Sequence, residues 1–256
     1  MSITRVSLQP AFVLHHRPYR DTSALLEIFT PEFGRVGLVA RGLRSAKSRL
    51  QGVVQPFSPL LVSWSGRGEL ATLTGCEPNG ALTRLDGSRV LSGFYLNELL
   101  LRLLHRHDPH PALFECYAQT LHLLQQSDME QRALRIFEKH LLREIGYALT
   151  LDHEAESGTP IEPGEAYSYH LERGPLKPDA GASASIRIQG HSLLALLNET
   201  LHDETSLRET KQLMRAALGL YLGHKPLQSR ELYIDFHKSR APSPSPSLAP
   251  VLENAL

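Results

Sequence analysis

The spacing of apolar residues along this 256-residue chain changes near residue 80, and this change constrains the fold more than any other feature. Before it, short β-prone runs are separated by turn signals, as in small barrels and sandwiches. After it, apolar residues recur every three or four positions, which is typical of helices. We therefore predict an α+β protein with a β-rich domain over residues 1–80 and helices beyond it.

The first domain contains five β-prone runs, at residues 11–16, 23–30, 35–40, 53–64 and 69–74. Residues 31–34 (PEFG) form a tight turn, and residues 65–68 (SGRG) supply the flexible positions of a hairpin. The interval between the third and fourth runs is about a dozen residues, which is longer than most hairpin loops. Five strands joined in this way predict a small barrel with one long loop.

The rest of the chain divides into four parts. Residues 81–147 carry three helical periods joined by short links, which favours an antiparallel bundle. Residues 148–190 are rich in Gly, Pro and Ser, and we expect a loop-rich insertion there. Helical periodicity returns over 191–240 and completes the helical domain. Residues 241–256 have too little apolar area to offset their ordering cost, so we expect a disordered tail.

Positive charge is concentrated in the first domain. The whole chain is balanced, with 27 Lys and Arg against 27 Asp and Glu. Four cations nevertheless lie within nine residues of the long loop, without an intervening acid: Arg41, Arg44, Lys47 and Arg49. A loop that only aids solubility usually mixes signs, so we interpret this one as a phosphate-binding element and keep the solvated loop as the alternative.

Aromatic side chains in the same domain could act as platforms on which bases stack. The candidates are Tyr19, Phe33, Phe57 and Trp64. Each is also a natural core or hairpin-packing residue, which is the more usual role of such side chains.

Several function classes lack their sequence signatures. There is no GxxxxGK[ST] phosphate loop and no GxSxG nucleophile motif. Cys76 and Cys116 are too far apart to suggest a CxxC pair, a disulfide framework or a thiolate zinc site. No apolar stretch is long enough to span a membrane and no secretory signal is recognisable, so we expect a cytoplasmic protein.

A metal site is the remaining chemical alternative. His105, His107 and His110 surround Asp108 in the link between the first two helices. Their spacing does not place them on one helical face, and no HExxH pattern accompanies them. We therefore favour a polar link over a metal-dependent nuclease, and we expect no catalytic residue, cofactor or bound metal.

The chain resembles the RecO family of bacterial recombination mediators. The resemblance is carried by separated blocks in a preserved order: AFVLHHRPYRDTSALLEIFTPEFGRVGLVARGLRS (11–45), LQGVVQPFSPLLVSWSGRGELATL (50–73), YLNELLLRLL (95–104), ALRIFEKHLLREIGY (133–147) and YLGHKPLQSREL (221–232). It implies an OB-fold N-terminal domain followed by a helical domain. In the family, the loop region often holds a four-cysteine zinc knuckle. Residues 148–190 contain no Cys, so we expect no zinc, and the order of this segment stays open.

The resemblance also implies a function. It implies binding of single- and double-stranded DNA, annealing of complementary strands, partnership with RecR, and indirect loading of RecA onto DNA coated by single-stranded DNA-binding protein. Annealing needs no covalent chemistry, so a non-enzymatic, nucleoid-associated protein is expected. A protein-interaction scaffold whose basic loop binds acidic peptides is the alternative, and no membrane partner is expected.

Two sets of site residues follow. The expected DNA contacts are Arg35, Arg41, Arg44, Lys47, Arg49 and Arg67. The coat protein's acidic C-terminal tail would need an apolar slot with a cationic rim. The candidates for that rim are Arg135, Arg215, Lys225 and Arg230.

Overall fold

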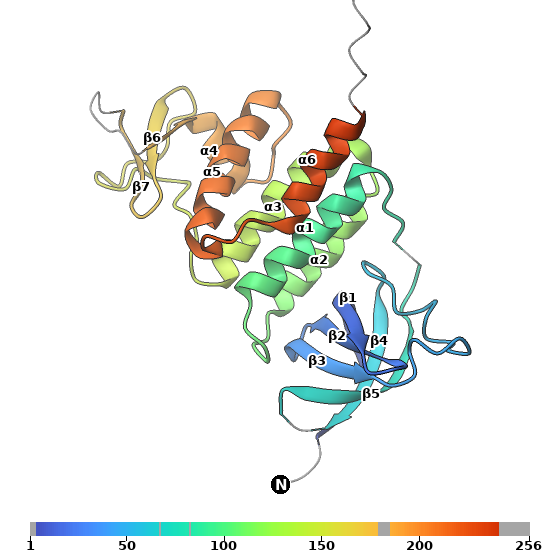
Figure 1. Ribbon diagram of the computed structural model, residues 1–256. Coiled ribbons are helices and arrows are strands. Elements are labelled where there is room, and N and C mark those ends of the chain that lie inside the picture. Colours follow the sequence, from blue (N-terminus) through green and yellow to red (C-terminus); the bar gives the residue numbers. More distant parts are fainter. Residues whose placement is uncertain (1–3, 67, 82, 179–184, 241–256) are drawn as a thin grey trace, which may run out of the picture.

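The computed structural model describes residues 4–66, 68–81, 83–178 and 185–240. Within these ranges, a closed barrel of five strands is followed by six α-helices and a small three-stranded sheet (Figure 1). The predicted α+β class, with an OB-fold barrel preceding a helical region, is confirmed. The expectation of a disordered tail concerns residues 241–256, which lie outside the described residues.

The barrel consists of β1 (Thr4–Tyr19), β2 (Ser23–Thr30), β3 (Gly34–Ala40), β4 (Leu60–Gly66) and β5 (Leu70–Pro78). Their order is β1-β2-β3-β5-β4, with β3 and β5 parallel and with β1 pairing β4 to close the barrel. This is the connectivity of an OB-fold. Residues 4–11 of β1 pair with β4 and residues 12–19 pair with β2. Each half contains one register shift, between Val6 and Gln9 and between Val13 and His15.

The fourth strand is shorter than its apolar run suggests. The run begins at residue 53, but β4 begins at Leu60. Pro56 and Pro59 lie in between, and a proline has no N–H to donate to a ladder. Residues 41–59 therefore form one long connection between β3 and β4.

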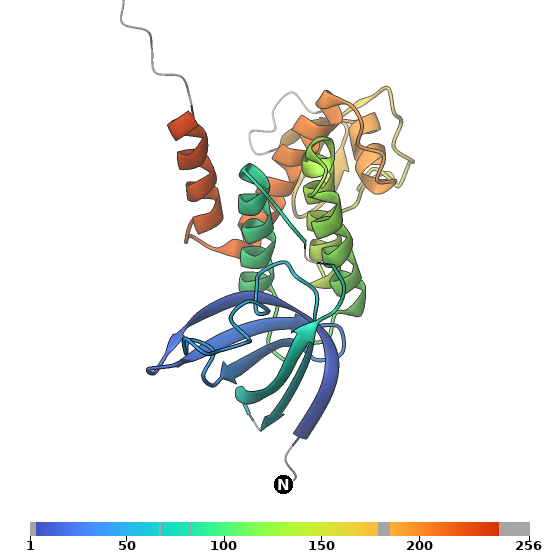
Figure 2. The same ribbon diagram turned by 90° about the vertical axis from the view of Figure 1, so that its right-hand side faces the viewer.

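The first three helices are α1 (Ser88–Leu103), α2 (Pro111–Leu123) and α3 (Glu130–Glu144), and Figure 2 shows them rising from the barrel. α2 begins at its proline, as expected from the ring's fixed φ. A 3₁₀ turn covers residues 127–129 before α3, and the Glu130 carboxylate accepts a hydrogen bond from the Ser92 hydroxyl of α1.

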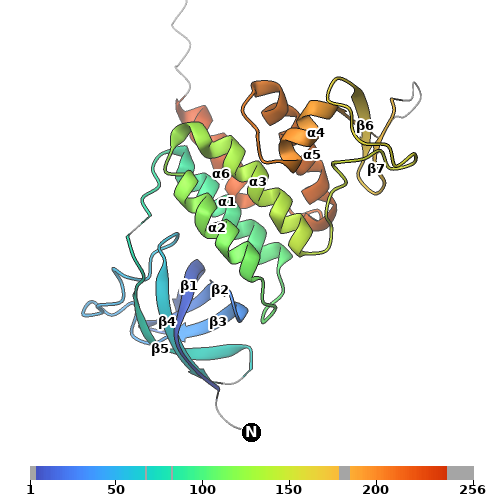
Figure 3. The same cartoon turned by 180° about the vertical axis from the view of Figure 1, so that it is seen from behind.

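The remaining helices are α4 (Gly190–Leu197), α5 (Glu204–Leu222) and α6 (Gln228–Arg240). The N-cap of α5 is Asp203, and its carboxylate accepts the Ser206 N–H at 2.8 Å. α6 packs along α1, as Figures 1 and 3 both show. Its first turn is held by the Glu98 carboxylate of α1, which accepts the backbone N–H groups of Gln228 and Ser229 at 3.0 and 2.9 Å.

The insertion contains more regular structure than expected. β6 (Ala166–His170) lies between β7 (Gly174–Leu176) and β8 (Ile186–Gln189) in an antiparallel sheet. Tyr167 and Tyr169 of β6 are buried in the main apolar core. A zinc ion is therefore not needed to anchor this sheet, because aromatic burial attaches it to the helices.

A carboxylate organises the turn that precedes the sheet. Glu154 is buried and accepts the hydroxyls of Ser157 and Thr159 at 2.9 and 3.1 Å. These bonds, together with the backbone N–H of Lys177, lower the pKa of Glu154. One anionic group thus joins three points of the chain, which is how a structural ion would act.

The barrel interior has its own apolar cluster, but part of the barrel's outer surface belongs to the core of the helical region. Phe12, Leu14 and Phe29 point outward from β1 and β2 and belong to the same buried cluster as the bundle residues Tyr117 and Phe137. A buried polar bridge accompanies this packing, since Asn97 of α1 donates to the Leu14 carbonyl oxygen at 2.9 Å and accepts from the Tyr117 hydroxyl. The helical region is therefore fixed on one side of the barrel. No helix in the described ranges is both long and apolar enough to cross a membrane.

The link between α1 and α2 lies against the turn between β2 and β3. The His107 N–H donates to the Arg35 carbonyl oxygen at 3.0 Å. Gly34 has a φ of 59°, and a Cβ there would lie 2.0 Å from the Asp108 carbonyl oxygen. No side chain fits between the two backbones.

We predict that Gly34→Ala destabilises the protein far more than Gly42→Ala. Both positions have positive φ, at 59° and 68°, so both pay the backbone penalty, but nothing lies within 4 Å of a Cβ at Gly42. We expect a loss of about 1 kcal/mol for Gly42→Ala and about 3 kcal/mol or more for Gly34→Ala. Urea unfolding measures both, and equal losses would contradict the close approach at Gly34.

Candidate nucleic-acid interface

The segment of residues 41–59 holds the basic residues in a defined path beside the barrel (Figure 1). Its apolar side chains Leu43, Val54 and Phe57 are buried and attach it to the barrel and to α1. The Arg44 N–H donates to the Thr22 carbonyl oxygen at 2.8 Å. The four cations of this segment remain exposed: Arg41, Arg44, Lys47 and Arg49.

Two further arginines, which sequence reasoning did not single out, lie at the same end of the barrel. Arg20 sits in the turn between β1 and β2, and its carbonyl oxygen accepts the Arg44 guanidinium at 3.3 Å. Arg17 is exposed on β1, where it pairs with Leu25 of β2, which in turn pairs with Val39 of β3. The turn between the first two strands is a usual binding element of OB-folds, and this rule could have identified both residues.

We use the name barrel-end cations for six exposed residues at the end of β1, in the β1–β2 turn and in the loop after β3: Arg17, Arg20, Arg41, Arg44, Lys47 and Arg49. In the described part of the chain, no carboxylate forms an ion pair with any of them. Their positive charge is therefore available to a polyanion, whose phosphates exchange condensed counterions for such side chains.

Arg35 has a different environment from the barrel-end cations. Its guanidinium donates to the carbonyl oxygens of Leu101 and Leu104, at 2.6 and 2.7 Å, at the C-terminal end of α1. It also pairs with Glu27 at 3.4 Å, and its side chain is 12% exposed. Burial lowers the pKa of Arg35, and Glu27 offsets part of this effect. Arg35 therefore attaches α1 to the barrel. Arg67, the other expected contact outside the loop, lies outside the described residues.

Among the four aromatic candidates, some pack inside the protein and one lies near the exposed cations. Trp64 is buried and packs edge-on against Phe33, with ring centroids 5.3 Å apart, and Phe57 packs against Phe94 of α1. Tyr19 alone of the four lies among the barrel-end cations, half-buried with the Arg20 guanidinium 5.2 Å from its ring centroid. It is the aromatic side chain best placed to meet a base.

The structure brings three of the four expected tail-binding residues toward one place in the helical region. Arg135 of α3 is buried and paired with Glu138, which also accepts the Tyr95 hydroxyl at 2.7 Å. Arg230 of α6 is close enough to lower the pKa of Tyr95, although burial raises that pKa more.

The third of these residues, Arg215, lies on α5 one helical turn beyond Lys211, and both are exposed. Although Lys211 is exposed, partial desolvation by neighbouring groups, followed by repulsion from Arg135, lowers the pKa of its ammonium group. Sequence reasoning missed Lys211, which its spacing of four residues from Arg215 could have indicated. We name Lys211, Arg215 and Arg230 the helical cations.

Lys225 lies apart from the helical cations. Its carbonyl oxygen accepts the Arg102 guanidinium at 2.8 Å in the link between α5 and α6. Arg102 is seven residues beyond Tyr95 on α1, which corresponds to about 10 Å along the helix axis.

The histidine-rich link does not assemble a metal site. His107 donates its backbone N–H to the barrel, while His110 lies 3.3 Å from Asp108 and 3.5 Å from Glu144. Among the described residues, no three His, Cys, Asp or Glu side chains converge in a way that could hold a metal ion.

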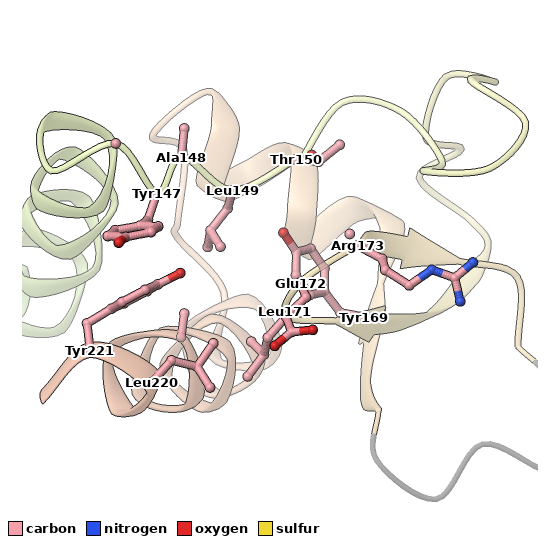
Figure 4. Close-up of a pocket in the computed structure, with 13 residues that line it drawn as sticks. Tyr147, Ala148, Leu149, Thr150, Tyr169, Leu171, Glu172, Arg173, Leu220 and Tyr221 are labelled. Atoms are coloured by element: carbon pink, nitrogen blue, oxygen red, sulfur yellow. The ribbon is translucent and has the colours of Figure 1, made fainter. Parts of the chain in front are cut away.

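One cavity of the described part lies far from the barrel. It has a volume of about 350 Å³ and lies between the end of α3, the β6–β7 hairpin and α5 (Figure 4). Tyr147 and Tyr221 stack at one end of it with centroids 3.8 Å apart, and Glu172 points toward its middle. None of the expected site residues lines it.

We predict that Arg35→Gln mainly lowers the stability of the protein, whereas Arg41→Gln mainly weakens DNA binding. Arg35→Gln leaves two helix-end carbonyl groups without their donor and removes one of the two guanidinium groups paired with Glu27, so we expect a loss of about 2–4 kcal/mol in unfolding free energy. Arg41→Gln changes an exposed side chain, so we expect at most about 0.5 kcal/mol, together with weaker DNA binding. Urea unfolding and fluorescence anisotropy separate the two, and a stable Arg35 variant with weakened DNA binding would return Arg35 to the interface.

Comparison with known proteins identifies relatives along nearly the whole chain. The family model for the N-terminal part of recombination protein O matches residues 1–81, and the model for its C-terminal part matches residues 84–231. A DNA repair protein RecO from Nitrosococcus oceani is 51% identical over 89% of this chain and 93% of its own length. Proteins of the same name from Alkalilimnicola ehrlichii and Coxiella burnetii are 48% and 49% identical, over 96% and 89% of this chain and 98% of their own lengths.

Proposed function

This chain belongs to the recombination protein O family of DNA repair proteins, and on that premise we propose that its barrel binds single- and double-stranded DNA and anneals complementary strands. The observation that carries the proposal is the set of barrel-end cations, which lack acidic partners in the described part of the chain. They also occupy the end of an OB-fold where nucleic acids are commonly bound.

Annealing by this surface is electrostatic. Two DNA strands repel each other through their phosphates, and a cationic surface lowers that repulsion when it replaces their counterions. Base pairing then supplies the driving force. The protein needs only to hold one strand without covering the edges of its bases, which backbone contacts through arginine and lysine allow.

We propose that no covalent step is involved. The two thiols of the chain are poor nucleophiles, because burial raises the pKa of Cys76 and of Cys116 to about 11. A thiol with such a pKa is almost entirely protonated at neutral pH. Nothing in the proposed annealing mechanism requires a general base or a metal ion.

We further propose that the helical region binds the acidic C-terminal tail of single-stranded DNA-binding protein, and that the chain acts with RecR to promote RecA loading. Lys211 and Arg215 present two exposed charges on one face of α5. The buried Arg135 is neutralised by Glu138, so it positions this surface and does not contact the tail. Protein and DNA would thus be held on different parts of the molecule.

The DNA proposal is tested with a pair of double variants. Arg41→Ala/Arg44→Ala removes two barrel-end cations, and Arg187→Ala/Arg208→Ala removes two exposed charges from the insertion and α5. For duplex DNA, we expect the first variant to reduce the slope of log affinity against log salt by about 2 and the second to leave it unchanged. Equal slopes in all three proteins would overturn the assignment.

A competition experiment tests the alternative that the protein is an interaction scaffold whose basic loop binds acidic peptides. Polyglutamate is titrated against a labelled oligonucleotide bound to the wild-type protein. We expect displacement only at a large excess of peptide, because a flexible peptide lacks the regular phosphate spacing of DNA. Displacement at an equal concentration of charge would favour a barrel that binds acidic peptides.

We predict that Lys211→Ala/Arg215→Ala weakens the binding of a synthetic acidic peptide with an apolar C-terminal residue by about tenfold or more. Lys225→Ala is the control, since this exposed residue lies apart from the helical cations, and it should change the affinity by less than about twofold. Both variants should bind oligonucleotides as the wild type does. A larger effect from Lys225 would move the site toward the link between α5 and α6.

A further inference from the structure

Two carboxylates lie on the outer face of the barrel beside the barrel-end cations. Glu27 of β2 and Glu69, just before β5, line a cavity of about 180 Å³ together with Arg17. Unpaired acids in this position would repel a phosphate backbone bound at Arg17. The distances across such a small cavity are within the Debye length of about 8 Å at physiological salt, so screening would not remove the repulsion.

A residue of the helical region occupies this cavity. Arg106 belongs to the link between α1 and α2, which lies against the barrel in Figures 1 and 3. Its guanidinium forms a short ion pair with Glu27 and donates to the Glu69 carboxylate at 3.2 Å. Its side chain is 32% exposed, so the group is accessible from solvent while it pairs with both acids.

The barrel backbone is closely packed beside this arginine. Gly37 of β3 pairs with Glu27 on one side and Leu70 on the other, directly below the guanidinium. A Cβ at Gly37 would lie 3.4 Å from the Arg106 Cζ atom and 2.9 Å from the Glu69 carbonyl oxygen. The contact with Arg106 is an ordinary one, whereas the contact with the Glu69 carbonyl oxygen is too close, so the missing Cβ lets the backbone at Glu69 approach β3.

The backbone of the link between α1 and α2 is bound to the barrel at Arg106, which sets the position from which its side chain extends. Arg106 is paired in isolated bridges with Gly34 and Arg35, and the neighbouring His107 N–H is bonded to the Arg35 carbonyl oxygen. Arg106 therefore reaches Glu27 from a backbone that is itself attached to the barrel. Its pairing with both acids comes from the docked position of the helical region.

We propose that Arg106, together with Arg35, neutralises Glu27 and Glu69 and thereby extends the DNA-binding surface from Arg17 across the barrel face to the helical region. The inference rests on the proposed DNA binding by the barrel-end cations. Arg106 acts here as a positioning residue. Arg35 already supplies one positive charge at Glu27, and Arg106 supplies the second, so a passing phosphate meets no net negative charge from the two acids. Arg106 lines the same cavity as Arg17.

The test is a double-mutant cycle between Arg106 and Glu69. Glu69 suits this purpose because its side chain is 77% exposed, so Glu69→Gln should leave stability unchanged. Affinity for a fluorescein-labelled oligothymidylate is measured at low salt for the wild type, Arg106→Gln, Glu69→Gln and the double variant. Arg89→Gln is the charge-matched control, since Arg89 pairs with Asp86 at the opposite end of α1 from the link.

We expect Arg106→Gln to weaken binding by about tenfold and Arg89→Gln by less than about twofold. Glu69→Gln should then restore about threefold or more in the Arg106→Gln background, but change the wild-type affinity by less than about twofold. A purely structural role for Arg106 would not give this difference, because removing an exposed acid does not repair a docking defect. Equal effects of Glu69→Gln in both backgrounds would overturn the inference.

The outcome also separates this inference from the proposed function. If Arg41→Ala/Arg44→Ala weakens DNA binding while Arg106→Gln does not, only the extension across the barrel face fails. If neither variant changes DNA binding, the barrel-end cations themselves are not the interface. Unfolding in urea is measured for every variant, and Glu27→Gln in the Arg106→Gln background replaces Glu69→Gln if Arg106→Gln alone proves unstable.

Discussion

The structure depends on the contact between the end of α1 and the turn between β2 and β3. The C-terminal end of a helix carries unpaired carbonyl oxygens and a partial negative charge. Arg35 supplies a guanidinium to two of these oxygens, while Gly34 allows the following link to approach the barrel backbone. Phe12 and Phe29 close the contact with apolar burial against α2. A cation, a missing Cβ and an aromatic cluster thus join two domains that otherwise have separate cores.

This contact determines which charges are available for binding. The helical region covers one end of the outer barrel face, and its Arg106 pairs with Glu27 and Glu69, while the barrel's own Arg35 also pairs with Glu27. The opposite end, formed by the β1–β2 turn and the loop after β3, keeps its arginines unpaired by acids within the described residues. Charge of one sign therefore gathers on the barrel although the chain as a whole is neutral. In the proposed function, the same docking that stabilises the protein also prepares its DNA-binding surface.

The insertion shows how a different chemistry can serve the same structural need. The family resemblance raised a zinc knuckle, and the absence of cysteines over 148–190 left the order of the segment open. In the structure, Glu154 joins the turn through hydroxyl and backbone donors, and Tyr167 and Tyr169 bury the sheet against the helices. A carboxylate receiving several hydrogen bonds and a metal ion receiving several ligands both hold distant chain segments together. This role of Glu154 could not be predicted from the sequence, because a carboxylate that accepts several hydrogen bonds in a Gly- and Pro-rich segment leaves no periodic pattern.

The sequence by itself determined the local elements: the change of hydrophobic period near residue 80 correctly separated barrel strands from helices, because periodicity is a property of neighbouring residues. It also located the basic loop and the family. It did not distinguish Arg35 from Arg41, since both are arginines at strand ends, nor did it indicate Arg17, Arg106 or Lys211. Only the tertiary structure decided which of these charges are paired and which are exposed. The reason is that the partner of a charge is set by segments far away in the chain, as when Arg106 crosses 79 positions to meet Glu27.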